Sequence, residues 1–256
     1  MLLALRVSGK SGATRRSAYN LVRSALDTAV RDDLIRTNPA AKVQRPVAGT
    51  KEATWLTPDQ VKAVIDAMKD HRLHGLVVLL ANSGLRIGEA LALRWQDIDL
   101  AAGVLRVTGT LGYVGGGWLR SEPKSLRSRR SIKLTPAALE ALKTRRKAQA
   151  VDQLSMGSSW RNELDLVFTT EHGAPLDRHN ALKTYKRFAE SVGVGGSFHT
   201  LRHSVATTLM ATGTPARVIA DILGHSSTDV TNDLYSHVSP ELAAEALGRL
   251  GKAMDS

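Results

Sequence analysis

With 256 residues, of which 43% are hydrophobic, the chain is long enough for one large domain or a domain with a fragment, and general disorder is disfavoured. The formal net charge of +11 favours a polyanion such as nucleic acid as partner, although a basic protein without such a partner fits it equally well. The lack of cysteine excludes disulfides, thiolate zinc sites and iron–sulfur clusters, and the 4% aromatic content disfavours single-strand binding by stacking, so duplex DNA is the better candidate.

The first part of the chain predicts one amphipathic helix followed by a linker. Apolar residues recur at helical spacing over 14–31, and the stretch 36–54 has two prolines and no periodicity. A single helix cannot bury its apolar stripe alone. We therefore expect residues 1–50 to be the end of a helical domain plus a linker, and residues 51–256 to form the second domain.

The second domain is predicted to be mostly helical. The stretch TPDQ at 57–60 is a capping box with proline at the first helical position, and it opens a helix toward Met68. Another helix is predicted to start in the same way, with Thr135 as its cap and Pro136 at its first position. Gly84 and Gly193 are each predicted to end a helix. The further helices are expected over 74–82, 85–95, 135–150 and 177–192 and in pieces from 199 onward.

Three short antiparallel strands are expected between residues 103 and 134. They are GVLRVTGT at 103–110, GGWLR at 116–120 and RSIKL at 130–134, and a brief extended stretch follows at 166–176. The fold class is therefore α+β, mostly helical, with one small antiparallel three-stranded sheet.

Several ionisable residues lie in apolar or tightly turned settings in four separate segments. Arg86 follows a helix-ending glycine, Lys124 lies in a predicted turn, and His199 and Arg202 are three apart on one helix. His225 follows a helix-ending glycine, and a tyrosine follows ten residues later. Taken singly, each is more simply explained as a solvated charge, a helix cap or a packed side chain, so only their order and spacing point to a site.

That order resembles the tyrosine recombinase (phage integrase) family. The matching stretches are SGLRIGEALALRW, EPKSLRSRRSIKL, HTLRHSVATTLMATG and ILGHSSTDVTNDLYSHV. The resemblance covers about residues 53–240 as the catalytic domain, with an integrase-like DNA breaking–rejoining fold, and residues 14–46 look like the last helix of the family's core-binding domain. Most of the core-binding domain and any arm-type DNA-binding domain are expected to be missing from this chain.

The resemblance implies a site-specific recombinase that cleaves and rejoins duplex DNA without metal, ATP or another cofactor. Tyr235 would be the nucleophile and form a 3′-phosphotyrosyl intermediate, His199 would accept its proton, and Lys124 would be the general acid for the leaving 5′ oxygen. Arg86 and Arg202 each present a planar fork to two oxygens of the five-coordinate phosphorus, which carries extra negative charge.

Other residues are assigned around this set. His225 would donate a further hydrogen bond to the phosphate. Glu89 holds the Arg86 guanidinium in place or forms a simple helix ion pair, and the two interpretations stay open. His203 is interpreted as a packing or structural residue. Phosphate contacts that position DNA are predicted for Arg120, Arg127, Arg129 and Arg130.

Three alternatives remain to be weighed. A zinc site of His199, His203 and His225 is disfavoured because the glutamate of a His-Glu-x-x-His motif is absent and Arg202 would lie beside the cation. A type IB topoisomerase shares the mechanism but relaxes supercoils. A non-catalytic DNA-binding protein would keep only the basic surface.

Assembly and location follow from the same resemblance. The stretch from about Pro240 to Lys252 has helix-start signals and an apolar stripe, and we expect it to link protomers in a tetramer on paired DNA sites. The sequence leaves open whether an accessory DNA-bending protein takes part. No apolar run approaches the roughly 20 residues of a membrane span, so we expect a cytoplasmic protein that is nucleoid-associated when bound to DNA.

Overall fold

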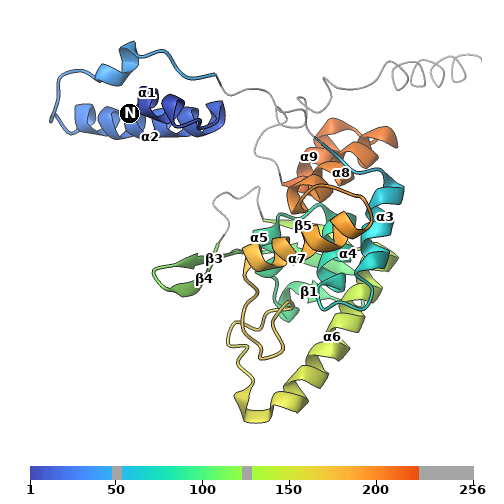
Figure 1. Cartoon of the computed structure of the whole chain (residues 1–256). Helices are drawn as coiled ribbons and strands as arrows, with labels where there is room; N and C mark the ends of the chain where they lie inside the picture. Colours follow the sequence, from blue (N-terminus) through green and yellow to red (C-terminus); the bar gives the residue numbers. More distant parts are fainter. Residues whose placement is uncertain (48–53, 123–128, 225–256) are drawn as a thin grey trace, which may run out of the picture. The chain divides into compact units, whose positions relative to one another are not determined.

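The computed structural model describes residues 1–47, 54–122 and 129–224, and the chain divides into two compact units, Met1–Glu52 and Ala53–Ser256 (Figure 1). Within the described ranges, no helix has both the length and the apolar character needed to cross a membrane.

The first unit consists of α1 (Leu2–Val7), α2 (Gly12–Arg31) and the short 3-10 helix η1 (Pro39–Lys42). The predicted helix over 14–31 is confirmed by α2, whereas α1 was not predicted. The hydroxyl of Tyr19, which is buried, donates to the carbonyl of Ala40 at 3.2 Å and ties η1 to α2. The apolar stripe of α2 is only partly covered within this unit, because Leu21 remains 73% exposed.

Several helices of the second unit begin or end where their local signals predict, whereas the helix predicted over 85–95 is only the short α5 (Ile87–Leu91), followed by the 3-10 helix η2 (Trp95–Asp97). Thr57 forms the capping box of α3, Thr135 caps α6, and Asp177 accepts two backbone N–H groups at the start of α7. Gly84 ends α4 in the left-handed conformation with φ of 61°. The helices are α3 (Pro58–Ala67), α4 (His74–Ser83), α5 (Ile87–Leu91), α6 (Pro136–Met156), α7 (Arg178–Ser191), α8 (Phe198–Ala211) and α9 (Ala216–Leu223).

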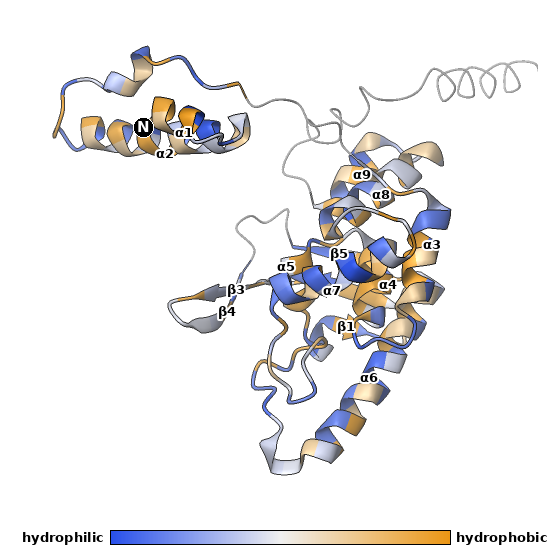
Figure 2. Cartoon of the chain, viewed as in Figure 1, coloured by the Kyte–Doolittle hydropathy of each residue, from blue (hydrophilic) through white to orange (hydrophobic). Residues whose placement is uncertain are grey.

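The core of this unit is built around α4, whose central residues 76–81 are all apolar, and most of this helix is orange in Figure 2. Leu76, Leu79 and Leu80 are almost completely buried in a cluster that extends through the neighbouring helices and strands. A second small cluster of Ala206, Met210, Ile219 and Leu223 packs α9 on α8. The first cluster thus joins α4 to α8 through Leu201, and the second cluster joins α8 to α9.

The strands form two small sheets, which confirms the predicted class but changes the predicted pairing. The three-stranded antiparallel sheet has the order β1 (Ile98–Asp99), β2 (Val104–Val107), β5 (Arg130–Lys133), with Leu105 opposite Ile132. The other two strands, β3 (Thr110–Val114) and β4 (Gly117–Ser121), pair only with each other among the described strands, and Figure 1 shows this ribbon projecting from the helices.

The predicted strand 103–110 is therefore broken, and GGWLR does not join the three-stranded sheet. The break at 108–109 lies beside the side chain of Arg120. A Cβ atom at Gly109 would lie 2.7 Å from the Arg120 guanidinium carbon. The same guanidinium donates to Thr108 and Asp97 at this point.

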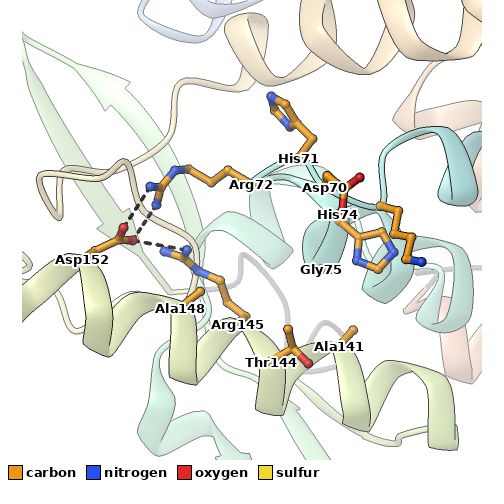
Figure 3. A pocket seen from close by; sticks show the side chains of 11 residues that line it. Asp70, His71, Arg72, His74, Gly75, Ala141, Thr144, Arg145, Ala148 and Asp152 are labelled. Atoms are coloured by element: carbon orange, nitrogen blue, oxygen red, sulfur yellow. Dashed lines mark hydrogen bonds and ion pairs between the residues drawn. The ribbon is translucent and has the colours of Figure 1, made fainter.

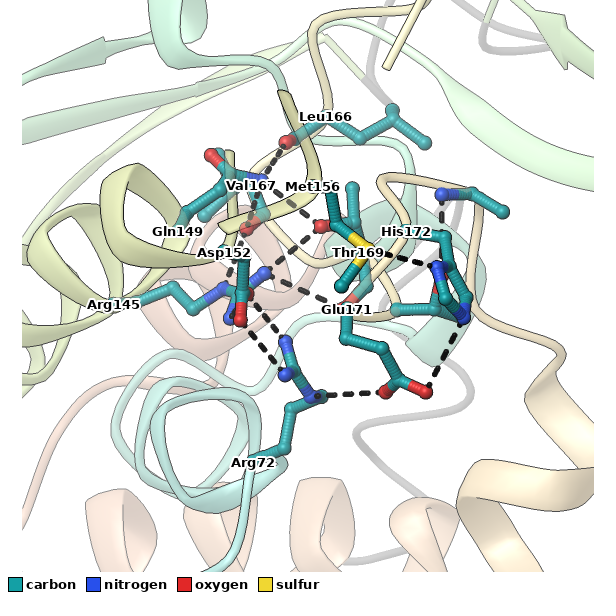
Figure 4. Close-up of polar contacts among 12 residues, drawn as sticks. Arg72, Arg145, Gln149, Asp152, Met156, Leu166, Val167, Thr169, Glu171 and His172 are labelled. Carbon is teal, nitrogen blue, oxygen red and sulfur yellow. Dashed lines mark hydrogen bonds and ion pairs between the residues drawn. The ribbon is translucent and has the colours of Figure 1, made fainter. Parts of the chain in front are cut away.

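The predicted extended stretch 166–176 has two isolated bridge pairs, and side chains of α6 add further hydrogen bonds to it. Arg145 donates to the Val167 carbonyl at 3.0 Å and to the Thr169 hydroxyl at 2.9 Å (Figure 4). Gln149 donates to the Leu166 carbonyl at 2.9 Å. Two buried polar side chains thus replace the hydrogen bonds that a paired strand would supply.

Arg145 also shares the carboxylate of Asp152 with Arg72 at the edge of a cavity of about 360 Å³ (Figure 3). Arg72 binds Asp152 through two hydrogen bonds of 2.6 and 3.0 Å, while Arg145 lies 3.7 Å from it. Burial, followed by the charge of Arg72, lowers the pKa of Arg145 to about 10.

We predict that Arg145→Ala lowers the free energy of unfolding by about 3 kcal/mol, because it removes the buried donor to the carbonyls of Val167 and Thr169 and to the Thr169 hydroxyl. Urea denaturation followed by circular dichroism measures the change. Lys147→Ala is the matched control, since Lys147 is an exposed residue of the same helix and should change the value by less than about 0.5 kcal/mol. Equal stability of the two variants would contradict the role given to Arg145.

Candidate active site

Arg202 lies where the C-terminal ends of α4 and α9 meet. Its guanidinium donates to the Gly84 carbonyl at 2.6 Å and to the Leu223 carbonyl at 2.8 Å, and the residue is 5% exposed. A Cβ atom at Gly84 would meet the Leu223 side chain, and the φ of 61° lies in the left-handed region, so both features favour glycine there. Arg202 therefore caps two helices at once.

Arg86 directly precedes α5, and its side chain, which is 46% exposed, also reaches the C-terminal end of α9. One guanidinium nitrogen donates to Glu89 at 2.9 Å and another to the Gly224 carbonyl at 3.1 Å. The backbone N–H of Arg86 also donates to Glu89 at 3.0 Å. Of the two open interpretations of Glu89, these contacts favour the one in which its carboxylate holds Arg86 in place.

Arg130 enters this group from β5. It donates to Glu89 at 3.0 Å and to the Ile222 carbonyl at 2.7 Å, and its side chain is 7% exposed. Arg120, from β4, is similarly engaged with Asp97 at 3.3 Å and with the Ala92 carbonyl at 2.9 Å. These contacts favour structural roles for both arginines over the phosphate contacts that the sequence predicted.

The other two residues predicted to contact phosphate are Arg129 and Arg127, and no buried contact is described for either. Arg129 is more than half exposed and pairs with the exposed Glu122 at 2.6 Å, which leaves it accessible to a ligand. Arg127 lies outside the described residues, as do three of the predicted catalytic residues, Lys124, His225 and Tyr235. The described chain ends at Gly224, directly before His225.

The described groups carry a surplus of positive charge. Arg86, Arg130 and Arg202 face one carboxylate, that of Glu89, and two helix C-termini that each carry about half a negative charge. Burial alone would raise the pKa of Glu89, but its bonds to Arg130 and Arg86 outweigh burial and the net shift is downward. Burial, followed by the charge of Arg86, lowers the pKa of Arg202 to about 9. A bound anion would offset the surplus.

His199 and His203 form a contact that the sequence did not predict. Their Nε2 atoms lie 2.9 Å apart, with ring centroids at 4.3 Å. His203 therefore contacts a predicted catalytic residue, whereas the sequence indicated a packing or structural role without naming this partner. Burial, followed by the charge of Arg202 and then that of Arg86, lowers the pKa of His199. The pKa of His203 is also lowered, by burial and then by His199.

The histidine pair predicts a pH dependence of stability. Because both pKa values in the folded chain lie below the ordinary 6.5, the unfolded chain binds more protons just below that pH. Their contribution to stability is present above pH 6.5 and is lost as the pH falls toward the lowered values. Urea unfolding is measured at pH 7.5 and 5.5. Between these two pH values, the free energy of unfolding should fall less in His203→Gln than in wild type.

The exposed His172 supplies the matched control, His172→Gln, which should keep the wild-type pH dependence. Identical curves for His203→Gln and wild type would contradict the assignment.

The described residues contain no group of three or more His, Asp or Glu side chains arranged to hold a metal ion. The zinc alternative included His225, which lies beyond Gly224. In the described part, the Nε2 atoms of His199 and His203 face each other.

One signal in the sequence could have indicated the inward roles of Arg120 and Arg130. The pattern Arg-x-x-acid occurs at 86–89 and again at 94–97, and in both cases the carboxylate accepts from the backbone N–H of its own arginine. Glu89 and Asp97 are each almost fully buried, and each takes a second arginine from a strand. A buried carboxylate is rarely left with a single partner, so two unassigned arginines are expected nearby.

The chain was compared with known proteins. Residues 54–241 match the model of the phage integrase family. The chain is 32% identical over 260 residues to a "Tyrosine recombinase XerC-like" protein of Caldanaerobacter subterraneus subsp. tengcongensis, covering 94% of this chain and 66% of that protein. It is 30% identical over 245 residues to "Tyrosine recombinase XerD" of Corynebacterium glutamicum, covering 92% and 73%.

Solved structures show the same fold. The Tn1549 transposon integrase in complex with a circular intermediate DNA has a TM-score of 0.82 and 22% identity, with 97% of this chain and 83% of that chain covered. A lambda integrase dimer bound to a COC′ core site has a TM-score of 0.63 and 19% identity, with 91% and 76% covered. The expected integrase-like fold is thereby confirmed, and the chain belongs to the phage integrase family of tyrosine recombinases.

Proposed function

We propose that this protein is a site-specific DNA recombinase that cleaves and rejoins duplex DNA through a 3′-phosphotyrosyl intermediate. The observation that carries the proposal is the pair Arg86 and Arg202, which are held by helix carbonyls and by Glu89 in a region of surplus positive charge. We assign residues 51–256 as the catalytic domain, and residues 1–50 as the end of a core-binding domain with its linker.

The proposed reaction begins when the Tyr235 oxygen attacks the phosphorus of a DNA phosphodiester. A tyrosine–phosphorus bond forms at the 3′ side while the bond from phosphorus to the 5′ oxygen breaks. His199 takes the tyrosine proton, and Lys124 gives a proton to the leaving oxygen. A 5′ hydroxyl of another strand reverses these steps, so no ATP is consumed.

Arg202 and Arg86 would stabilise the charge that develops on the non-bridging oxygens. Both guanidinium groups are already positioned by the chain, so little reorganisation is needed during the reaction. The lowered pKa of His199 supports its role, because the imidazole must be neutral before it accepts a proton. His203 would orient the His199 ring through the hydrogen bond between the Nε2 atoms of the two histidines.

Trapping of the covalent intermediate tests the proposal. Duplexes that carry the direct repeats flanking the gene are nicked close to the core, so that the cleaved fragment dissociates and the adduct accumulates. We expect a protease-sensitive protein–DNA adduct that survives sodium dodecyl sulfate and forms equally well in EDTA. Binding without an adduct would favour a non-catalytic DNA-binding protein, and strong EDTA inhibition would favour a metal enzyme.

The topoisomerase alternative is tested by the products. A recombinase joins strands of two different duplexes that share a core sequence, whereas a topoisomerase relaxes supercoils within one duplex. The relatives named above are recombinases and support strand exchange.

Assembly on DNA belongs to the same proposal. We infer that the segment 240–252, which lies outside the described residues, links neighbouring protomers into a tetramer on paired sites. The apolar stripe of this segment supports the inference. Gel-shift experiments with residues 239–256 deleted should lose the paired-site complex, and an accessory DNA-bending protein is needed only if purified protein fails to form it.

A further inference from the structure

The side chain of Arg130 joins two parts of the site that are far apart in the sequence. Its guanidinium binds both carboxylate oxygens of Glu89, at 3.3 and 3.0 Å, and donates to the Ile222 carbonyl at 2.7 Å. Glu89 in turn binds Arg86, and Ile222 lies in the last turn of α9. Arg130 therefore contacts the partner of one predicted catalytic residue and the helix that leads to two others.

The last three carbonyls of this helix end each accept from a different arginine. Ile222 accepts from Arg130, Leu223 from Arg202 and Gly224 from Arg86. These are carbonyl groups without a partner inside the helix, where the dipole is negative, so three cations are favourable there.

A second observation shows how closely Arg130 fits. Gly224 has φ of 68°, and a Cβ atom there would lie 2.6 Å from a guanidinium nitrogen of Arg130. The guanidinium thus packs directly against the backbone at the point where the chain leaves α9 toward His225.

We propose that Arg130 is a positioning residue for the proposed cleavage reaction: it holds Glu89, and through it Arg86, in register with the end of α9. The inference rests on the proposed function and assigns Arg130 no contact with DNA.

The electrostatic consequence of losing Arg130 follows from the burial of Glu89, whose side chain is 8% exposed. Without Arg130, its carboxylate would keep only the side chain and backbone N–H of Arg86 among these partners. Arg86 would then be drawn toward Glu89 to compensate the buried charge, and its fork would turn away from an incoming phosphate. The end of α9 would lose one of its three cations at the same time.

The test compares Arg130→Gln with Lys133→Gln, which removes the same charge from an exposed position of the same strand. Single-turnover cleavage of the nicked duplex is measured at saturating DNA and at a temperature where both variants are folded. We expect Arg130→Gln to lower the rate constant about a hundredfold, because small misplacements of catalytic groups cost about that much. DNA affinity should change by less than about threefold in both variants, and Lys133→Gln should cleave at the wild-type rate.

Two further measurements separate positioning from general destabilisation. Amide hydrogen exchange in 216–224 should be faster in Arg130→Gln than in Lys133→Gln, while exchange in α6 stays unchanged. In a double-mutant cycle, Glu89→Gln should lower the cleavage rate constant much less in the Arg130→Gln background than in wild type, because the two substitutions remove the same contact.

A wild-type rate in folded Arg130→Gln, or additive effects in the cycle, would overturn the inference while leaving the proposed function intact. A wild-type protein that forms no adduct would instead contradict the proposed function and the inference with it. Arg130→Lys should recover part of the rate, since an ammonium group retains the charge but reaches only one of the two partners.

Discussion

Tyr235→Phe is expected to abolish covalent protein–DNA adducts while DNA affinity changes by less than about twofold. The substitution removes one oxygen atom, which is the proposed nucleophile, and leaves the ring and the cationic groups in place. Denaturing gels of the nicked-duplex reaction measure the adduct, and gel shifts of intact duplex measure the affinity.

The other three tyrosines are either buried or hydrogen-bonded to a backbone carbonyl in the described structure. Burial raises the pKa of Tyr185 to about 12, and the Tyr19 hydroxyl is buried against the Ala40 carbonyl. Tyr113 is exposed and donates to the Gly116 carbonyl at 2.9 Å, so Tyr113→Phe is the matched control and should cleave normally. Mass spectrometric mapping of the adduct to any tyrosine other than Tyr235 would contradict the assignment.

The helices could be predicted because their signals are local. A capping threonine, a proline at the first position and a terminating glycine act within one turn, and α3, α4 and α6 begin or end at these residues. The strand pairing was not predicted, and the break at 108–109 lies beside Arg120 of β4, which donates to Thr108 and Asp97. No periodicity in the sequence records such a contact.

The same limit applies to the site. The order of cations and tyrosine identified the family, because each of four segments carries its own short motif and the order of the segments can be read from the sequence. The direction of each side chain was not predictable: Arg129 and Arg130 are neighbours, yet one is exposed and the other binds Glu89, 41 residues earlier in the chain. His203 likewise contacts His199 because the two are four residues apart on α8 and their rings turn toward each other.

Arg202→Ala is expected to lower the single-turnover cleavage rate at least a thousandfold. The substitution removes a charge-assisted donor from the developing phosphorus oxyanion, and the loss of one such donor costs about a hundred- to a thousandfold. It also leaves the carbonyls of Gly84 and Leu223 without this partner, so the two helix ends are expected to separate. A fall in the melting temperature of Arg202→Ala is therefore part of the expected result.

Arg202→Lys separates the two effects. A lysine keeps the charge but binds only one of the two carbonyls at a time, and it cannot present a planar fork to phosphate. We expect this variant to remain folded at 25 °C and to cleave about a hundredfold more slowly than wild type.

Inorganic phosphate provides a readout without DNA. An anion that binds the folded chain near Arg86 and Arg202 raises the melting temperature, and the stabilisation grows with the logarithm of the anion concentration once the concentration exceeds Kd. Wild type should gain stability as phosphate replaces chloride at constant ionic strength, and Arg202→Lys should gain much less. Arg217→Ala is the matched control, because Arg217 is an exposed residue of α9 that pairs with Asp221 on the helix surface. An equal gain in all three proteins would indicate a general salt effect, and a wild-type cleavage rate in Arg202→Lys would remove Arg202 from the proposed mechanism.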